Sequence, residues 1–456
     1  MTIIAVVKED CPTCRLVEPV LQELLAAGVV EKIHREDEPA GLDTSYHLGI
    51  ETVPTLIKGE DRIVGWSREQ WEAFTGIDHL GEGLPDYRPG CGSRTLDPGV
   101  AEELAVRFRG GSLRSRRVDL GVLEDEAEAM FDRGWTDGLP VVPPTEARVL
   151  RMLEGTTRPP DDVVAVVPPD LVDCTVEKVA VNAVMAGCRP EYLPVVLACV
   201  EAACTDEFNM HGLLATTYFS GPVVIVNGPL SRAIGMNSRG NALGQGNRAN
   251  ATIGRALQLV VRNVGGGKPG GVDRATLGNP GKLTFCFAED EEGSPWESLA
   301  VERGFLPGAS TVTLFAGEGP RGVVDQLSRT PESLAGSMAA CLRSVAHPKL
   351  PMGFDAFVVV SPEHARVFAE GGWSKARVKE ELHARLQLDG AEIVRGAGGI
   401  AEGVPEAFGG ATLPKFRPDG LWLVHAGGGA GLFSAIIGGW VNGEAGSQPV
   451  TREVGT

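Results

Sequence analysis

The stretch Lys8-Glu9-Asp10-Cys11-Pro12-Thr13-Cys14-Arg15 decides the fold of the first part of the chain. It directly follows an apolar run, residues 3–7, that is typical of a strand, and it directly precedes a helical pattern of apolar residues that begins at Leu16. The two cysteines therefore lie at a strand-to-helix junction, where unpaired backbone N–H groups and the helix dipole stabilise a thiolate. Such a position can lower the pKa of the first cysteine from about 8.5 to between roughly 3.5 and 7.5. We therefore expect Cys11 to be a nucleophile and Cys14 to be the thiol that resolves its mixed disulfides.

Two prolines support this interpretation. Pro19 follows Cys14 by five residues inside a good helical pattern, where a proline costs about 3 kcal/mol without compensation. Pro54, in Thr52-Val53-Pro54-Thr55, opens a pair of expected strands. With the cysteine pair, these residues resemble the thioredoxin and glutaredoxin superfamily over residues 1–77. The resemblance implies that Pro54 is a cis-proline that faces the cysteine pair and helps to bind an extended substrate. The order of elements reads βαβαββα, over residues 3–7, 11–27, 30–35, 42–48, 54–58, 62–65 and 67–74.

Two positions depart from the thioredoxin pattern. Asp10 stands where thioredoxins place a tryptophan before the first cysteine, and Ala5 stands where they keep a buried carboxylate. A carboxylate beside Cys11 should oppose thiolate formation, which favours a reducing or relay module over a strong oxidant. Two other readings of the cysteine pair stay open. One is a structural zinc site, although no other Cys-x-x-Cys supplies a second ligand pair, and the other is an inactive scaffold.

The composition of the chain limits the classes of protein to which it can belong. The chain has 456 residues and should fold into two or three domains. A net charge of −18 argues against nucleic acid or an anionic membrane as a partner, because both require a basic surface. We expect no signal sequence and no membrane span, since the first residues run straight into a strand and the longest apolar runs are short or interrupted by glycine. Nine cysteines, an odd number spread along the chain, suggest reduced thiols and a cytoplasmic location.

Residues 78–117 lack sustained periodicity and are interpreted as a linker. They contain Cys91, in Gly90-Cys91-Gly92-Ser93, which is either an exposed spectator or a third thiol that exchanges with Cys11 or Cys14. Residues 118–456 alternate short strand patterns with helical ones, which predicts a larger multi-layer α/β domain with a mostly parallel or mixed sheet and with room for two subdomains. The expected strands are residues 163–167, 223–226, 283–287, 312–315, 357–360 and 421–424.

This long region resembles a group of uncharacterised bacterial proteins, the UGSC-type (seleno)proteins. The likeness rests on residues 135–145, 181–192 and 246–256. The group's name describes a Sec/Cys-Gly-Ser-Cys tetrapeptide, and Cys91-Gly92-Ser93-Arg94 matches its first three positions and lacks the last cysteine. The resemblance implies no established reaction.

The strongest pattern in the large region runs from the strand at 223–226 through a loop rich in Gly and Asn to a helix that begins near Asn250. Free N–H groups, amide side chains and an arginine gather around one helix N-terminus, an arrangement that stabilises an anionic group. The loop lacks a Gly-Lys-Ser/Thr ending and a proper GxGxxG, so ATP and NAD are not indicated. We expect a carboxylate, phosphate or thiolate ligand; the alternative is a long structural loop. The residues expected to bind it are Asn227, Asn237, Arg248 and Asn250.

A second unit of strand, Gly-rich loop and helix is expected at residues 422–434, where His425 at the strand's carboxyl end suits acid–base chemistry. Cys188, at a helix end, and His211, in a turn, are further candidates, although a buried inert thiol is the commoner fate of such a cysteine. The acidic run at 288–292 offers carboxylates, but such a run is most often a solvated loop. No spacing of His, Asp and Glu reaches the strength of a metal motif.

Together these patterns predict a thiol–disulfide oxidoreductase module coupled to an α/β domain that acts on a small anionic or thiol-containing substrate. Electrons or sulfur would be relayed through Cys11 and Cys14, and through Cys91, to a site that includes Cys188, His211, Arg248 or His425. No cofactor is implied beyond the redox-active Cys11–Cys14 disulfide. A redox partner protein and a homo-oligomer are left open. The rival hypothesis is a redox-sensing protein whose large domain only binds a ligand.

Overall fold

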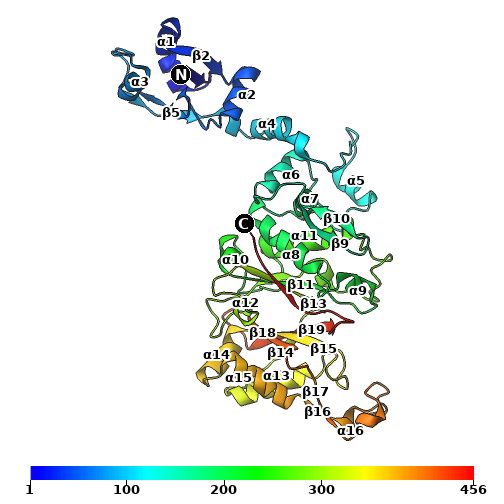
Figure 1. The fold of residues 1–456 in the computed structure, drawn as a ribbon. Coiled ribbons are helices and arrows are strands. Elements are labelled where there is room, and N and C mark those ends of the chain that lie inside the picture. Colours follow the sequence, from blue (N-terminus) through cyan, green and yellow to red (C-terminus); the bar gives the residue numbers. More distant parts are fainter. Residues whose placement is uncertain (1, 456) are drawn as a thin grey trace. The chain divides into compact units, whose positions relative to one another are not determined.

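The chain folds into two compact units, which divide between Leu113 and Arg114 (Figure 1). The computed structural model describes residues 2–455. Both units combine helices with sheets, which confirms the predicted α/β class. No helix in the described part of the chain is long and apolar enough to cross a membrane.

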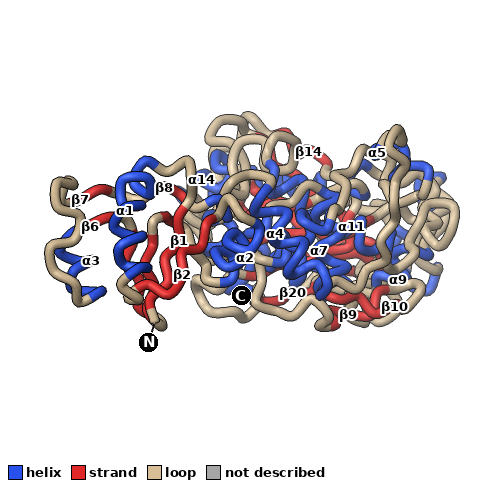
Figure 2. Tube along the Cα trace, turned by 90° about the horizontal axis from the view of Figure 1, so that it is seen from above, coloured by secondary structure: helices blue, strands red, loops and turns tan. Residues whose placement is uncertain are grey.

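The first unit is built on a four-stranded sheet in the order β2-β1-β4-β5. The strand β1 pairs in parallel with β2 and antiparallel with β4, and β4 pairs antiparallel with β5. Figure 2 shows β1 and β2 side by side. The predicted βαβαββα order is present, with two short strands added: β1 (Ile3–Val7), α1 (Pro12–Ala26), β2 (Val30–Arg35), α2 (Pro39–His47), β3 (Thr52–Val53), β4 (Thr55–Lys58), β5 (Asp61–Val64), β6 (Trp66–Ser67) and α3 (Arg68–Thr75).

Helix α1 begins at the cysteine pair and contains Pro19, as the sequence predicts. Its apolar residues recur at helical spacing, so Val17, Val20, Leu21 and Leu24 are buried against the sheet. Pro19 lies on the exposed face, where the helix does not need to pack closely. The apolar stripe therefore fixes the orientation of α1 and, with it, the position of the two cysteines at its first turn.

Residues 78–113 are part of the first unit, which corrects their interpretation as a linker and moves the boundary from residue 77 to residue 113. They contain β7 (Tyr87–Arg88), paired with β6, and β8 (Cys91–Gly92), paired with β3, followed by α4 (Val100–Arg109). Ser93 is 1% exposed, and its hydroxyl donates to the buried carboxylate of Glu36. The strands β7 and β8 have only two residues each, so they give no periodicity in the sequence. Their partner strands, β6 and β3, lie far from them along the chain.

The main sheet of the second unit contains eight strands, which form two mixed groups. Within each group one pair of strands is parallel, β11 with β12 and β15 with β18, and the other pairs are antiparallel. A single paired position, Gly317 with Gly439, links the two groups. The first group is β11 (Gly221–Asn227), β12 (Cys286–Ala288), β13 (Thr311–Gly317) and β20 (Val450–Glu453), and the second is β14 (Arg321–Val324), β15 (Phe354–Val360), β18 (Leu421–His425) and β19 (Phe433–Val441).

Alternate residues along a strand point to opposite faces of the sheet, and the cores that they join show how the two groups of strands are layered. Val223 and Ile225 of β11 share one apolar core with Phe357 and Val359 of β15, so the two groups of strands pack face to face. The opposite face of β15 packs against helices, which are α13 (Pro331–Leu342), α14 (Pro362–Glu370) and α15 (Lys375–Arg385). On the far side of β11 and β13, Figure 1 shows the helices α7 (Val176–Ala186), α8 (Leu193–Ala203) and α11 (Arg248–Asn263). The second unit is therefore a four-layer α-β-β-α arrangement, in which strands are apolar on both faces.

One predicted element of the second unit is wrong. The Gly-rich loop after β18 was expected to lead into a helix, but it leads into the long strand β19. Glycine at 438 and 439 masks the strand pattern, although β19 pairs with both β14 and β15. The remaining elements lie around the four layers: α5 (Glu126–Asp132), α6 (Glu146–Leu153), β9 (Val163–Val167), β10 (Val172–Thr175), α9 (Met210–Ala215), α10 (Pro229–Ala233), α12 (Leu299–Glu302), β16 (Gln387–Asp389), α16 (Gly390–Ile393) and β17 (Thr412–Pro414).

Candidate functional site

The cysteine pair of the first unit lies at the first turn of α1. Cys11 is the residue that caps this helix, and its Sγ accepts the backbone N–H of Cys14 at 3.3 Å. The same Sγ lies 3.6 Å from the carbonyl oxygen of Val53. Cys11 is 0% exposed and Cys14 is 2% exposed, so neither sulfur is open to solvent. A nucleophile at this point would react inside the protein or after a local opening.

The two thiols have opposite electrostatic environments. Burial alone would raise the pKa of Cys11, but hydrogen bonds from the Cys91 thiol and from Cys14 hold that pKa below its ordinary value. Burial raises the pKa of Cys14, and its proximity to Cys11 raises it further. The first cysteine is therefore the better thiolate and the second is a protonated neighbour, which is the division of roles expected from the sequence.

The peptide bond between Val53 and Pro54 is cis. It lies between β3 and β4, and the carbonyl that precedes Pro54 is the one closest to Cys11 Sγ. Pro54 is buried beside the cysteine pair. The three residues expected to form the redox site, Cys11, Cys14 and Pro54, are thus brought together.

The expected effect of Asp10 is absent. Its side chain is 93% exposed and lies 3.7 Å from Arg15. An exposed charge is screened by water, so Asp10 does little to the buried sulfur of Cys11. The pKa of Cys11 is lowered in spite of the carboxylate next to it in the sequence.

Cys91 is the third member of the thiol site. In the pairing of β8 with β3, Cys91 stands opposite Val53, the residue that contacts Cys11. Burial and the neighbouring Cys11 sulfur raise the pKa of Cys91, so it is the protonated donor of the interaction between them. Cys91 is partly exposed, unlike the other two cysteines. Of the two interpretations of Cys91, this position beside Cys11 favours a third thiol over an exposed spectator.

In the second unit, polar residues gather where strands of both groups end; we call this the strand-end cluster and define it as Asn227, Glu289, Asp290, Glu291 and His425. The Nδ2 of Asn227 donates to Glu289 at 2.6 Å and to Glu291 at 2.7 Å. The backbone N–H of Asp290 donates to the carbonyl oxygen of His425 at 2.8 Å. The cluster thereby ties the end of β11 to the segment after β12 and to the end of β18.

Glu289 is the most buried acid of the strand-end cluster, at 4% exposure. Its Oε2 also accepts the backbone N–H of Leu299 at 2.7 Å, and burial raises the pKa of its carboxyl group. The acidic run at 288–292 was expected to be a solvated loop, but the carboxylates of Glu289 and Glu291 and the backbone of Asp290 hold the ends of strands together. Their sequence signal was only their position directly after a strand.

His425 is 1% exposed, and its Nδ1 lies 3.0 Å from the carbonyl oxygen of Asp290. A carbonyl oxygen can only accept, so Nδ1 is the donor of this hydrogen bond. Nε2 is buried without a hydrogen-bond partner. The histidine thus lies in a core position, and the Gly-rich loop behind it meets the other Gly-rich loop, where Gly427 N donates to Ser238 O at 3.0 Å.

Unlike Asn227, the two other asparagines expected to bind a ligand, Asn237 and Asn250, bind the loop itself. Asn237 accepts the N–H of Arg239 and donates to Gly240 O, and Asn250 bonds both to the backbone of Asn237 and to Ala242 O. These amides keep the loop closed against the start of α11. Their hydrogen-bonding groups are used internally, which accords with the structural alternative for this loop.

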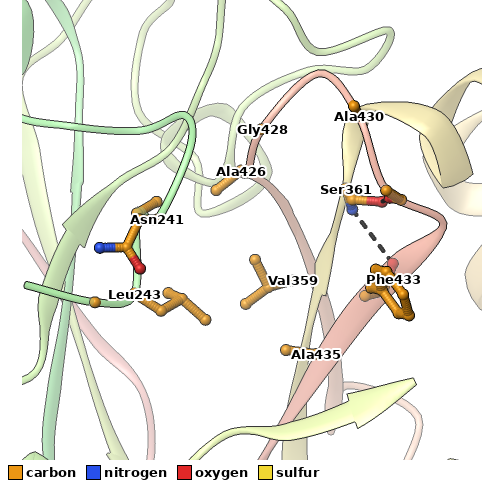
Figure 3. Close-up of a pocket in the computed structure, with 14 residues that line it drawn as sticks. Asn241, Leu243, Val359, Ser361, Ala426, Gly428, Ala430, Phe433 and Ala435 are labelled. Atoms are coloured by element: carbon orange, nitrogen blue, oxygen red, sulfur yellow. Dashed lines mark hydrogen bonds between the residues drawn. The ribbon is translucent and has the colours of Figure 1, made fainter. Parts of the chain in front are cut away.

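Two cavities flank the meeting point of the Gly-rich loops. The first, of about 440 Å³, lies between residues 241–244 and residues 426–435, and Figure 3 shows Asn241 and Leu243 on one side of it and Ser361 and Phe433 on the other. The second, of about 320 Å³, is lined by Arg232 and Arg239 and by the acidic run 289–292. Each arginine pairs with an acid of that run, so the second cavity has charges of both signs.

Arg248 faces a different cavity, of about 700 Å³. Its Nε donates to Gly187 O at 2.9 Å, and three further arginines line the same space: Arg148, Arg151 and Arg189. Glu154 and Glu191 also line it. Arg248 is predictable from the Gly/Asn-rich loop that precedes it. The other arginines are not predictable in this way, because they come from α6 and from the turn after α7 and share no local pattern.

Cys188 lines the same cavity but is a poor nucleophile. It is 6% exposed, its Sγ donates to Thr252 O at 3.4 Å, and burial raises its pKa to about 12. His211 is exposed on α9, and no hydrogen bond or ion pair within residues 2–455 joins it to Cys188, Arg248 or His425. Of the second-site candidates, Cys188 and Arg248 therefore line one cavity, and His211 and His425 are not among the residues that line it.

In the described part of the chain, no group of three or more His, Cys, Asp or Glu side chains is arranged to hold a metal ion. Comparison of the chain with models of known families, with curated proteins and with solved structures finds no match in any of the three.

Proposed function

We propose that the first unit is a thiol–disulfide oxidoreductase of the thioredoxin-like kind. One observation carries the proposal: two thiols one helical turn apart have pKa values shifted in opposite directions, down for Cys11 and up for Cys14. Thiol–disulfide exchange needs this asymmetry, because the thiolate attacks and the protonated neighbour waits to resolve the product. The position of Pro54, buried directly after Val53, whose carbonyl oxygen lies 3.6 Å from Cys11 Sγ, supports the resemblance.

The reaction is a two-electron exchange. The Cys11 thiolate attacks one sulfur of a disulfide, a new S–S bond forms at Cys11, and the other sulfur leaves as a thiolate that takes up a proton. Cys14 then loses its proton and attacks Cys11 Sγ, which releases the second thiol and leaves the Cys11–Cys14 disulfide. The substrate disulfide has gained two electrons, and the cysteine pair has lost them.

The proposal assigns to the second unit the binding of a small anionic or thiol-containing molecule on which this redox chemistry acts. The cavity lined by Arg248 and three other arginines supports it, because guanidinium groups bind carboxylate and phosphate in a bidentate manner. The rival hypothesis is a redox-sensing protein that binds the ligand in the same cavity. It differs from the proposed enzyme because it does not convert the ligand.

Oxidation of the reduced, full-length protein with glutathione disulfide tests the redox role. Peptide mapping without reductant should find a Cys11–Cys14 disulfide in the natural chain and in a Cys341→Ser control, whose cysteine lies partly exposed on α13. Cys11→Ser should release no more glutathione than its exposed thiols account for. If Cys11 and Cys14 both stay free in the natural chain after Cys341 has reacted, the oxidoreductase proposal is wrong.

A further inference from the structure

The thiol site is covered by a segment of its own unit. Residues 87–92, which we call the docked segment, run across the first turn of α1 between two short pairings, β7 with β6 and β8 with β3. The hydroxyl of Thr13, inside the Cys-x-x-Cys motif, donates to Pro89 O at 2.7 Å. The docked segment is therefore bonded both to β3, next to Pro54, and to the cysteine loop itself.

The fit of the docked segment is close. A Cβ at Gly90 would lie 2.4 Å from a methyl carbon of Thr52 and 2.8 Å from Val53 O, so only glycine can pass this point without displacing β3. Directly after the segment, the N–H of Arg94 donates to the buried carboxylate of Glu36 at 2.8 Å. The segment is thus anchored at its start, middle and end, and it holds Cys91 in one position.

The three thiols differ in their exposure to solvent. Cys11 and Cys14 are 0% and 2% exposed, whereas Cys91 is partly exposed. The edge of β3 at which Val53 stands opposite Cys91 is already paired with β8, so an external peptide cannot add to β3 as a strand at that edge. A disulfide from solution meets Cys91 before it meets Cys11.

We propose that Cys91 is the built-in substrate of the cysteine pair: it carries a small thiol as a mixed disulfide, and Cys11 reduces that disulfide within the same unit. This inference rests on the proposed oxidoreductase function and narrows it. The substrate class is a low-molecular-weight disulfide or thiol adduct, and protein disulfides are excluded by the docked segment.

The proposed reaction consists of two thiol–disulfide exchange steps. The starting state is Cys91–S–S–R with Cys11 as thiolate and Cys14 as thiol. Cys11 attacks Cys91 Sγ, the bond to R breaks, RS⁻ leaves and takes up a proton, and a Cys11–Cys91 disulfide forms. Cys14 then attacks Cys11, which returns Cys91 as a thiolate that receives the Cys14 proton. The net result is one RSH, a reduced Cys91 and an oxidised Cys11–Cys14 pair, with two electrons moved to the adduct.

Oxidation of the full-length Cys14→Ser variant with glutathione disulfide tests the inference, because this variant stops after the first step. Non-reducing peptide mapping should find Cys11 joined to Cys91, in the variant and in a Cys14→Ser, Cys341→Ser control. Glutathione on Cys11 with Cys91 free would overturn the inference and leave the oxidoreductase function intact. Glutathione that persists on Cys91 with Cys11 free would mean that Cys11 does not react. If Cys11 reacts with nothing, both proposals fail.

A measurement on the natural chain avoids dependence on a variant. Reduced protein given one equivalent of glutathione disulfide should first carry glutathione on Cys91 and then lose it as the Cys11–Cys14 disulfide appears. The second phase should be first order, with a rate that does not change over a tenfold range of protein concentration, because donor and acceptor belong to one unit. A rate proportional to protein concentration, or direct formation of Cys11–Cys14 without the Cys91 adduct, would overturn the inference.

Discussion

Cysteines of the first unit and of the second unit have opposite surroundings. In the first unit, Cys11 lies at the start of a helix with a thiol donor beside it, and its pKa is lowered. In the second unit, Cys188, Cys199 and Cys286 lie among apolar residues, and burial raises the pKa of each. Both kinds are buried, so burial alone does not decide whether a cysteine is reactive.

What separates the two groups is the supply of hydrogen bonds to sulfur. Cys11 Sγ receives the Cys14 N–H and the Cys91 thiol, which stabilise a negative charge. Each sulfur also lies near a backbone carbonyl, Val53 O for Cys11 at 3.6 Å and Thr252 O for Cys188 at 3.4 Å, so the groups that donate to Cys11 make the difference. The comparison predicts chemistry in the first unit and inert packing in the second.

Native alkylation should show the largest difference. Because burial raises the pKa of Cys188 from 9.0 to about 12, its thiolate fraction at a fixed pH near neutrality should be about a thousandfold below that of an ordinary thiol. Iodoacetamide labelling followed by mass spectrometry should give a rate for Cys188 that rises about a thousandfold or more on unfolding in urea. Cys341, partly exposed, is the internal control. Equal rates for Cys188 in the folded and unfolded chain would break the comparison.

The strand-end cluster tests whether buried polar groups of the second unit are structural. Glu289→Ala leaves the N–H groups of Leu299 and His425 without their acceptor, so the free energy of unfolding of the second unit should fall by about 2–4 kcal/mol. Urea unfolding measures the change. Glu292→Ala, at a side chain that is 60% exposed, is the matched control and should change it by less than about 0.5 kcal/mol. A small effect at Glu289 would point to a ligand-binding role instead.

Local patterns predicted the first unit well because its key residues are neighbours in the sequence. The cysteine pair, Pro19 and the run of elements to α3 each occupy a few consecutive residues with a strong preference. The docking of Cys91 was not predictable in this way. It depends on two-residue strands and on Glu36, which lies far from Ser93 along the chain but bonds to it.

In the second unit, the strands were predictable and the site was not. Val223–Val226 and its counterparts are apolar on both faces because each lies between a helix layer and another sheet. The direction of an amide side chain leaves no such pattern, so Asn237 and Asn250 were expected to bind a ligand although they close the loop. Strand β19 was missed because glycines interrupt its apolar residues.

The arginine-lined cavity provides a smaller test of the second unit. Arg248→Ala should weaken binding of an anionic ligand by about 1.5–3 kcal/mol, the scale of a charge-assisted hydrogen bond, and Arg248→Lys should recover only part, because a point charge lacks the guanidinium fork. Thermal-shift titrations with phosphate and small carboxylates measure this. Arg366→Ala, on the exposed side of α14, is the control. If these anions stabilise all variants equally, the prediction of an anion site at Arg248 is wrong.

The smallest expected effect concerns the thiol donor of Cys91. Its hydrogen bond favours the thiolate of Cys11, so Cys91→Ala should raise the pKa of Cys11. Since the thiolate exists above its pKa, the ultraviolet absorbance of the Cys11 thiolate should then appear at higher pH, and exchange should slow most at the acidic end of the range. Cys91→Ser keeps a hydroxyl donor of similar size and should shift the midpoint less. An unchanged midpoint in Cys91→Ala would mean that the helix N-terminus and the Cys14 N–H suffice, and that Cys91 is placed for exchange alone.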